Sequence, residues 1–528
     1  MIGRTSTASL LAMTLAAPAL AQDGTDACAA LAGVAAHDTI VSEAAMQPAA
    51  DGLPAHCLVR GVIEPRIGVG GRQYGTGFEL RMPEDWSGRF VMQGGGGWDG
   101  AVRPATGVID RTKPEDTALA RGIAVASTDA GHTGDSPVDG WWGLDQKARV
   151  DNGYNSAKLT AERSRDLMRR FYGEMPHHSY FMGCSNGGRQ GMVAAVRYPQ
   201  YFDGVLAGAP AFDLTPSVIA WNWNTKVLKD LAEAETGGDI SATFSDDELA
   251  MISQAAIAEC DGADGAEDGL VMAPLQCSFD PAALQCGEGE SNQCLSEGQV
   301  DALKKIQQGP KDGEGNLVYP GWSLAGIDGP SGWRAWIVGG RPGPETSARG
   351  GMFQKDWMRL VGSTPPRPDF DAMTFDIDDR DFLQEAAPLF AATSTDYDAF
   401  ADKGGKLIVW HGTADPAFST ARIAGWFDTL RDDMGDTEVE DFARLYLTPG
   451  VHHCGGGAGL TSFDALSPLI DWVENGEAPE AIEASGTPPG AEAPVTRPLC
   501  PHPAHAAPED GDGADGSGED QEFTCVTP

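Results

Sequence analysis

A serine set between glycines, with a cysteine directly before it, constrains this chain more than any other short segment. Residues 183–187 read Gly-Cys-Ser-Asn-Gly and fit the G-x-S-x-G pattern of a sharp strand-to-helix turn that exposes the serine oxygen. The flanking sequence agrees, because His178–Met182 predicts a short buried strand and Gly187–Tyr198 a helix with a small-residue face. The segment therefore predicts Ser185 as a nucleophile.

A serine hydroxyl is a weak nucleophile, so it needs a base, and the base needs an orienting acid. In chains with this turn the order is serine, acid, histidine. Asp415 is the predicted acid, in a turn just past the apolar run Lys406–Trp410; a capping aspartate is the alternative. His453 is the predicted base, because it follows a strand and directly precedes Cys454, and His452 is its rival.

Acyl transfer also requires backbone N–H groups that bind the oxyanion. The amide of Asn186, directly after the predicted nucleophile, is one expected donor. The glycine-rich loop Gln93–Trp98 follows an early predicted strand and can supply the other. A flexible turn is the alternative for this loop, and as a phosphate-binding loop it lacks both the G-x-G-x-x-G spacing and the lysine.

The first 21 residues predict a secretory signal. Arg4 provides the positive start, Leu10–Leu20 the apolar stretch, and Ala19-Leu20-Ala21 a cleavage site before Gln22. The apolar stretch is too short to span a bilayer, which disfavours an uncleaved anchor. We therefore expect a secreted or periplasmic protein with no membrane partner.

All ten cysteines follow the predicted signal, and an even number in an exported chain argues for disulfides. Sequence alone does not fix their connectivity. Short spacings favour three local pairs and leave two more: Cys260–Cys277, Cys286–Cys294 and Cys500–Cys525, then Cys28–Cys57 and Cys184–Cys454. Zinc is the rival interpretation, but no C-x-x-C spacing supports it. The acidic, glycine-rich segment Pro508–Glu522 predicts a surface loop closed by the last pair.

The chain carries 77 acidic and 37 basic residues, a formal net charge of −40. Nucleic acid is disfavoured as a partner, because binding to phosphates needs a basic face. The simplest interpretation of the excess of acidic residues is that they form a solvated surface rather than steer ligands to the protein.

Apolar runs and helical stretches alternate along much of the chain and predict an α/β fold with an α/β-hydrolase core. We expect residues 22–211 to form the first part of this core and residues 396–528 the second part. Between them, from 212 to 395, the sequence is rich in Gly, Trp and Asp and predicts an irregular inserted lid domain, placed after the strand that follows the serine. The expected elements after Ser185 are a strand Asp203–Ala207, a strand Lys406–Trp410, a helix from Thr420, a strand Arg444–Leu447 and a helix Asp464–Trp472.

The inserted region contains a second candidate site. Three aspartates, Asp261, Asp264 and Asp268, recur at intervals of three and four among glycines, between Cys260 and Cys277. Hard carboxylate oxygens in tight turns suit Ca²⁺, although the spacing is not that of an EF-hand. An acidic surface loop is the alternative interpretation.

Together these segments resemble the tannase and feruloyl esterase family over nearly the whole mature chain. Cys184-Ser185, Asp415 and His453-Cys454 match the family's catalytic constellation, in which the two cysteines are bonded. The resemblance also implies the five cysteine pairs and Gly97 as the second oxyanion donor. It further implies a structural calcium in the lid, held by the side chains of Asp261, Asp264 and Asp268 and the carbonyls of Ala266 and Leu270.

Within that family the chain is most similar to a hydrolase of a terephthalate half-ester. The shared stretches are Arg81–Pro83, Asn152–Ser156, Tyr180–Gly191, Ala207–Pro210, Gly332–Trp336 and Thr496–Pro501. In that relative a lid arginine pairs with the substrate's free carboxylate, and Arg349 falls near the corresponding place when a small gap is allowed. The residue after the nucleophile is Asn here rather than an acid.

The expected substrate is a small ester of an aromatic acid, a mono(2-hydroxyethyl) terephthalate-like half-ester or a feruloyl or galloyl ester, hydrolysed by a monomer. The lid span Trp333–Trp357 offers flat apolar walls for such a ring, with Trp336 and Phe353 as expected contacts and Arg334, Arg341 and Arg349 as cations. Two other interpretations are a catalytically silent calcium-stabilised binding protein and a peptidase on the same fold.

Overall fold

The structure is a computed structural model that describes residues 24–36, 38–109, 111–288, 293–509 and 522–527. The predicted signal at 1–21 and most of the acidic segment Pro508–Glu522 lie outside the described residues.

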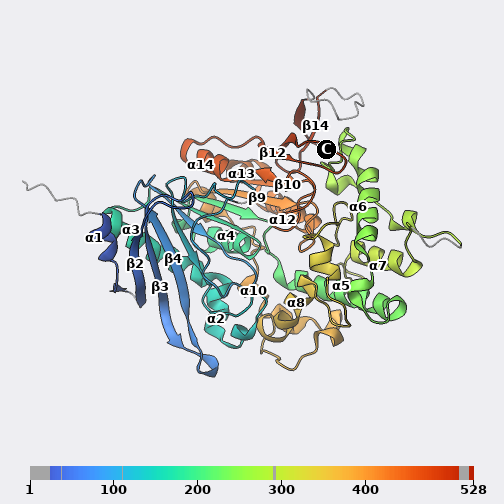
Figure 1. Cartoon of the computed structure of the whole chain (residues 1–528), viewed down its shortest axis with the longest axis horizontal. Coiled ribbons are helices and arrows are strands. Elements are labelled where there is room, and N and C mark those ends of the chain that lie inside the picture. The colour runs from blue at the N-terminus through green and yellow to red at the C-terminus, as the bar shows by residue number, and fades with distance from the viewer. Residues whose placement is uncertain (1–23, 37, 110, 289–292, 510–521, 528) are drawn as a thin grey trace, which may run out of the picture.

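A ten-stranded mixed sheet forms the centre of the molecule (Figure 1). Its order is β1-β2-β3-β4-β6-β5-β7-β8-β9-β10, antiparallel from β1 to the β4–β6 pair and parallel from β6 to β10. The antiparallel part comprises β1 (Ala35–Ala36), β2 (Thr39–Gln47), β3 (His56–Ile67) and β4 (Gln73–Pro83). The parallel part comprises β5 (Arg89–Gln93), β6 (Ala124–Thr128), β7 (His178–Cys184), β8 (Gly204–Gly208), β9 (Lys406–Gly412) and β10 (Ala443–Thr448).

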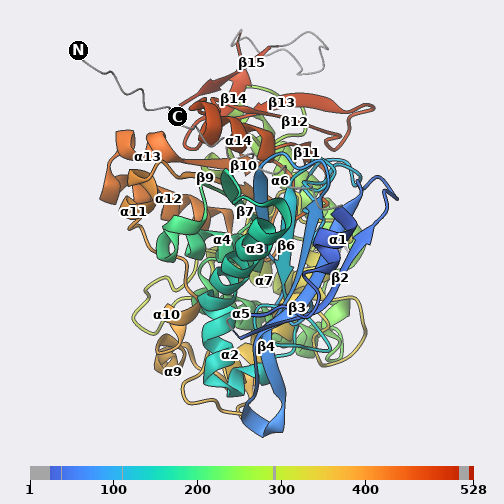
Figure 2. The ribbon, with the colours of Figure 1, turned by 90° about the vertical axis from the view of Figure 1, so that its left-hand side faces the viewer.

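Helices cover both faces of the parallel strands, so alternate strand residues enter two separate cores. Phe181, Val205 and Val409 belong to one core, which includes residues of α3 (Ser156–Tyr172), α4 (Asn186–Arg197) and α12 (Thr420–Met434). Met182 and Leu206 belong to the other core, which includes residues of α14 (Leu466–Asn475). Burial on both faces explains why these strands are continuous apolar runs. Figure 2 shows α3 and α4 side by side over the sheet. The predicted α/β class is confirmed.

The prediction that the stretch from 212 to 395 is irregular is wrong, because much of it is helical. Between β8 and β9 the chain forms α5 (Leu214–Glu235), α6 (Asp246–Cys260), α7 (Glu297–Gln308), α8 (Arg349–Asp356) and the short α9 (Asp381–Gln384) and α10 (Ala387–Phe390). In α5, Trp221, Asn222, Asn224 and Thr225 are all buried in near succession. A helix buried around most of its circumference has no apolar stripe at 3.6-residue spacing, so its sequence gave no helical signal. In Figure 1 these helices gather beside the sheet.

Smaller elements complete the fold. They are α1 (Gly24–Ala29), α2 (Gln146–Val150), α11 (Asp398–Asp402), α13 (Asp436–Phe442), a three-stranded sheet β11 (Ser462–Phe463), β12 (Ile482–Gly486) and β13 (Val495–Leu499), and a hairpin β14 (His505–Pro508) and β15 (Phe523–Val526). The predicted disulfides are present: Cys28–Cys57, Cys184–Cys454, Cys260–Cys277, Cys286–Cys294 and Cys500–Cys525.

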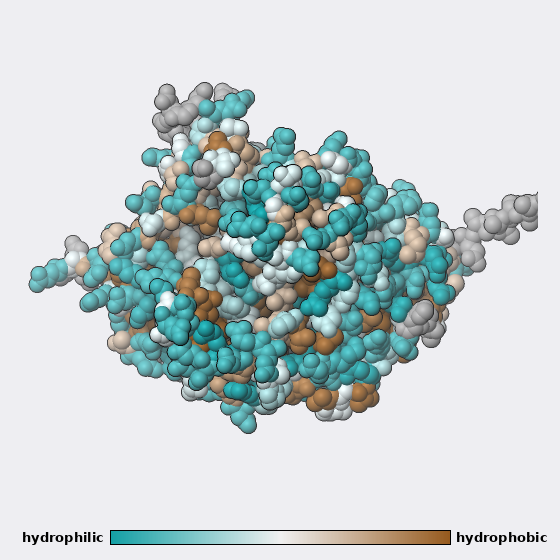
Figure 3. All heavy atoms as spheres, turned by 180° about the vertical axis from the view of Figure 1, so that it is seen from behind, coloured by the Kyte–Doolittle hydropathy of each residue, from teal (hydrophilic) through white to brown (hydrophobic). Residues whose placement is uncertain are grey.

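Most of the face seen from behind is hydrophilic, with scattered apolar residues (Figure 3). This agrees with a solvated surface for a chain of net charge −40. Among the described residues, no helix has the length and apolar character needed to cross a bilayer.

Candidate active site

Ser185 lies in the turn between β7 and α4, in a backbone conformation that residues with side chains rarely adopt. Its φ is 61° and its ψ is −123°. Close packing of backbone holds this turn: a methyl group on Gly187 would lie 2.7 Å from the Gly95 carbonyl oxygen, and one on Gly183 would lie 2.8 Å from the Gly187 carbonyl carbon. The Ser185 N–H also donates to the Gly208 carbonyl at 2.9 Å. Glycines are therefore required on both sides of the serine.

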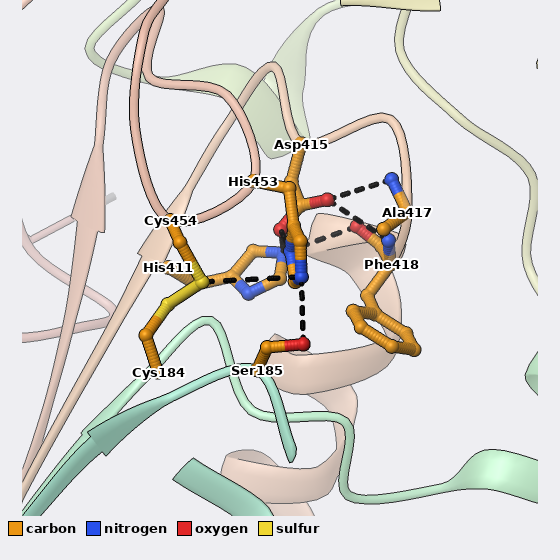
Figure 4. Close-up of a disulfide and its surroundings, with 8 residues drawn as sticks. All are labelled: Cys184, Ser185, His411, Asp415, Ala417, Phe418, His453 and Cys454. Atoms are coloured by element: carbon orange, nitrogen blue, oxygen red, sulfur yellow. Dashed lines mark hydrogen bonds and ion pairs between the residues drawn. A yellow bond between two sulfur atoms is a disulfide. The ribbon is translucent and has the colours of Figure 1, made fainter. Parts of the chain in front are cut away.

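Three side chains from distant parts of the chain meet at this turn (Figure 4). His453 Nε2 lies 2.8 Å from Ser185 Oγ, and His453 Nδ1 lies 2.8 Å from Asp415 Oδ2. Asp415 comes from the turn after β9 and His453 from the turn after β10. The carboxyl ends of adjacent parallel strands lie at one edge of the sheet, which is why these loops meet there.

The Asp415 carboxylate is completely enclosed but well supplied with donors. Its Oδ1 accepts the backbone N–H groups of Ala417 at 2.7 Å and Phe418 at 3.0 Å. Burial by itself would raise the pKa of Asp415, but His453, His411 and the Phe418 N–H together outweigh it and hold this pKa below its ordinary value. Asp415 therefore stays ionised and can fix the imidazole with Nδ1–H toward the carboxylate.

The rival base His452 and the nearby His411 both have other partners. His452 contacts Ser331 Oγ through Nδ1 at 2.7 Å and the Gly326 carbonyl through Nε2 at 2.7 Å, so both of its ring nitrogens are occupied. The His411 ring is buried, with Nε2 3.1 Å from the Phe418 carbonyl. Neither ring reaches the serine.

The Cys184–Cys454 disulfide joins the residue before Ser185 to the residue after His453. The two cysteines are 270 positions apart in sequence. The Cys454 sulfur also lies 3.9 Å from His453 Nε2, the nitrogen that faces the serine. The covalent bond thus limits how far the serine turn and the histidine loop can separate.

The two predicted oxyanion donors line a cavity of about 480 Å³ together with Ser185 and His453. Asn186 begins α4, and Gly97 lies in the loop after β5. The loop is tied to the serine turn by two backbone bonds: Gly94 N–H donates to Met182 at 2.8 Å, and Gly187 N–H donates to Gly95 at 3.0 Å. The arrangement suits acyl transfer, with a hydroxyl, an imidazole and two amide-bearing segments around one space.

Aromatic rings from the region between β8 and β9 wall this cavity. Trp336 and Phe353 are stacked, with ring centroids 6.0 Å apart, and Trp336 also meets the His453 ring edge-on at 4.9 Å. Trp333 and Trp357 are instead fully buried and belong to the core of that region. Of the four aromatic residues in the predicted span, two therefore line the cavity and two pack in the core of this region.

The three arginines that were expected near the substrate lie in different places. Arg334 forms an ion pair with Asp246 at 2.7 Å, and Arg341 lines a neighbouring cavity. Arg349 lines the cavity of Ser185, with its guanidinium carbon 5.7 Å from the Trp336 ring centroid.

The sequence matches the pattern of tannase and feruloyl esterase over residues 57–526. The chain belongs to the tannase and feruloyl esterase family.

Relatives and solved structures agree with membership of the family. A mono(2-hydroxyethyl) terephthalate hydrolase from Piscinibacter sakaiensis is 38% identical, over 93% of this chain and 89% of that protein. A probable feruloyl esterase from Arthroderma benhamiae is 33% identical, over 80% of this chain and 78% of that protein. The crystal structure of feruloyl esterase B from Aspergillus oryzae has the same fold, with a TM-score of 0.78 at 23% identity, over 96% of this chain and all of that one. These relatives are esterases, which supports an esterase activity for this member of the family.

Other residues that line the cavity carried no signal in the sequence. Arg103 and Trp98 come from the loops after β5, Trp221 from α5 and Phe418 from the turn before α12. Trp98 is the last residue of the glycine-rich loop, and its place there was the only available hint. Within the described part of the chain, neither Arg103 nor Arg349 forms a side-chain ion pair.

The aspartate loop of this family member folds into turns whose carboxylates mostly bind backbone amides. Asp264 accepts the N–H groups of Ala266 at 3.0 Å and Met272 at 2.9 Å, and Asp268 pairs with Arg497 at 2.7 Å. Burial raises the pKa of Asp264 to about 7 and also raises that of Asp261, and repulsion from Asp268 adds to both. The buried Asp261 Oδ1 has no hydrogen-bond partner. An unpartnered oxygen among crowded carboxylates fits a cation, although no three metal-ligating side chains are gathered as a cluster among the described residues.

We predict that removing the Cys184–Cys454 bond impairs turnover more than it impairs folding. The Cys184→Ser/Cys454→Ser variant should lose about tenfold or more in kcat, because small misplacements of reacting groups cost up to about 10²-fold. Ester hydrolysis and the melting temperature are measured together.

The Cys28→Ser/Cys57→Ser variant is the matched control, since this pair joins α1 to β3, away from Ser185. It should lower the melting temperature, in line with the roughly 2–5 kcal/mol that a native disulfide contributes, and leave kcat within about twofold. Equal kcat in both variants would show that the Cys184–Cys454 bond has no role in the geometry of the site.

Proposed function

We propose that this protein is a serine esterase that hydrolyses esters of aromatic acids through an acyl-enzyme. One observation carries the proposal: the hydrogen-bonded series Ser185–His453–Asp415 opens into a cavity walled by Trp336 and Phe353. In the proposed arrangement, residues between β8 and β9 form a lid over the core, consistent with Trp336, Arg349 and Phe353 all lining that cavity.

In the first half-reaction, Ser185 Oγ attacks the ester carbonyl while His453 Nε2 takes the hydroxyl proton. The negative oxygen of the tetrahedral intermediate is bound by the N–H groups of Gly97 and Asn186. Collapse of the intermediate breaks the bond to the alcohol, which leaves with the proton from His453. In the second half-reaction, water attacks the acyl-enzyme, His453 takes a proton from the water, and Ser185 leaves with that proton as the aromatic acid is released.

An aromatic acyl group suits the stacked walls of the cavity, because flat rings pack well against Trp and Phe. Two arginines, Arg103 and Arg349, face the same space in a chain with an excess of acidic residues. A guanidinium without an ion pair favours a ligand that carries a carboxylate. Among aromatic esters we therefore propose a terephthalate half-ester over an uncharged galloyl or feruloyl ester.

Five disulfides fit an oxidising compartment. We propose a secreted or periplasmic monomer.

Ser185→Ala tests the mechanism. We expect kcat for p-nitrophenyl esters to fall by several powers of ten, because loss of a nucleophile removes the covalent route. A serine-directed phosphonate should label the wild-type peptide that contains Ser185.

Ser136→Ala is the control, since Ser136 lines the same cavity without a histidine beside its hydroxyl. It should stay within a few-fold of the wild type. Near-normal turnover by Ser185→Ala would refute the proposed mechanism.

Arg349→Ala tests whether Arg349 recognises a free carboxylate on the acid part of the substrate. We expect kcat/KM for mono(2-hydroxyethyl) terephthalate to fall roughly 10–100-fold, as for the loss of a charge-assisted hydrogen bond of about 1.5–3 kcal/mol. Hydrolysis of methyl ferulate and methyl gallate, which carry no carboxylate, should change little.

Arg341→Ala is the control from the neighbouring cavity and should leave both activities unchanged. A selective loss in Arg103→Ala instead would assign the carboxylate to Arg103. Equal losses on charged and uncharged esters would mean that Arg349 supports folding rather than recognition.

We also propose that one Ca²⁺ binds the loop 261–270, through the side chains of Asp261, Asp264 and Asp268 and the carbonyls of Ala266 and Leu270. The two positive charges of the ion, together with the Arg497 guanidinium that pairs with Asp268, would balance the three carboxylates and stabilise the turns. A chelator should lower the melting temperature, because a ligand at a hundredfold excess over its Kd stabilises the folded state by about 2.7 kcal/mol.

Metal analysis should find one calcium per chain, and Asp261→Asn should abolish the chelator effect. Asp301→Asn, which removes an exposed carboxylate of α7, is the control and should retain it. An unchanged melting temperature with no bound calcium would identify the loop as acidic surface only.

A further inference from the structure

A second buried carboxylate, Asp99, lies beside the active site but does not line its cavity. It follows the glycine-rich loop two residues after Gly97, and only 8% of its surface is exposed. Its backbone has a φ of 60°, and its N–H donates to the Gly96 carbonyl at 3.1 Å. The mechanism proposed above gives this group no part.

Both oxygens of Asp99 accept hydrogen bonds from α4, the helix that begins directly after Ser185. Asn186 Nδ2 donates to Oδ1 at 2.7 Å, and Gln190 Nε2 donates to Oδ2 at 2.8 Å. The Gln190 side chain also accepts the Gly95 N–H at 3.3 Å. The carboxylate therefore joins the loop of one oxyanion donor, Gly97, to the residue that provides the other, Asn186.

The other end of the Asn186 side chain is fixed as well. Its Oδ1 accepts Arg189 Nε at 2.6 Å. Arg189 is completely buried, and its two terminal nitrogens donate to the carbonyls of Gly153 at 2.8 Å and Asn152 at 3.0 Å. An amide held at both ends cannot rotate, so the series Asp99–Asn186–Arg189 fixes the first residue of α4 relative to the glycine-rich loop.

We propose that Asp99 is a positioning residue for the oxyanion hole, acting through the side chain of Asn186 to set the distance between the N–H groups of Gly97 and Asn186. The inference rests on the proposed esterase mechanism, in which both groups bind the negative oxygen. Donors must be placed before the charge develops, since reorganising them during the reaction would add to the barrier. A carboxylate can accept from Asn186 and Gln190 at once because it has two acceptor oxygens and no donor of its own.

The charge of Asp99 is costly where it lies. Burial raises its pKa to about 6, despite the donors from Gln190 and Asn186 and the positive charges of Arg189 and Arg103. Nearby Asp129 is also buried, and its pKa is raised partly by repulsion from Asp99. His132 does not compensate, because burial lowers its pKa to about 3 and keeps it neutral. A carboxyl with a raised folded-state pKa lowers stability above that pKa, so at pH 8 the ionised group costs folding energy.

Because ionised Asp99 lowers stability at pH 8, removing its charge can distinguish a positioning role from a merely structural one. Asp99→Asn removes the buried charge, and we expect its melting temperature at pH 8 to be equal to or higher than that of the wild type. One of the two hydrogen bonds is lost, because an amide has only one acceptor oxygen. We expect kcat for an uncharged p-nitrophenyl ester to fall about 10–100-fold, somewhat less than the full loss of an oxyanion donor, with KM within about twofold.

An exchange of the two side chains provides the rescue. Asn186→Asp alone places two carboxylates in contact and should also lose at least tenfold in kcat. In Asp99→Asn/Asn186→Asp, the amide now at position 99 can donate to the carboxylate at position 186 and accept from Gln190, while Arg189 pairs with that carboxylate. We expect kcat of the double variant to exceed that of either single variant at least fivefold.

Wild-type turnover tests the proposed function, and the comparison of variants tests this inference. An inactive wild type would overturn both. With an active wild type, unchanged kcat in Asp99→Asn would overturn the positioning role alone. A double variant no better than the poorer single variant would overturn it too, as would a loss of kcat in Asp99→Asn that only matches a lower folded fraction.

Discussion

Close backbone packing around Ser185 is the constraint on which the site depends. A non-glycine residue in a sparsely populated conformation costs about 1–3 kcal/mol and persists only where its surroundings enforce it. Here Gly183 and Gly187 allow β7, α4 and the loop after β5 to touch through backbone atoms, and this packing holds Ser185 in its conformation. The same contacts that hold the serine outward also bring Gly97 and Asn186 to one cavity.

Two buried carboxylates near this turn illustrate how surroundings decide protonation. Asp415 faces the His453 ring, which lowers its pKa, whereas Asp99 faces neutral amides and more distant arginines, and burial raises its pKa. The first is suited to stabilising a positive imidazolium that forms during reaction. The second is suited to accepting fixed hydrogen bonds, at some expense of stability.

The region between β8 and β9 shows where sequence patterns do not predict the structure. Helix α5 packs among residues of its neighbouring helices and near Trp98 and Trp142, so most of its length is buried on several sides. Periodicity reveals a helix most clearly when one side faces water, and α5 has no such side over most of its length. By contrast, α3 has a less buried side and is followed by Gly173 with φ 85°, a local signal that a helix ends.

The sequence by itself determined the elements whose cause is local. The serine turn follows from its glycines and the parallel strands from continuous apolar runs. The candidate acid follows from its place in the chain order, and the candidate base from that order and from Cys454 beside it. Only the tertiary structure decided which residues between β8 and β9 reach the serine: Trp336, Phe353 and Arg349 line the cavity, whereas Trp333 and Trp357 are buried in the core of that region and Arg334 pairs with Asp246. The contacts of Asp99 with Asn186 and Gln190 were likewise invisible, because they join segments about 90 residues apart through side-chain geometry. Short spacings specify a turn, but a cavity is made by residues distant in sequence, and their side chains meet only after the chain has packed.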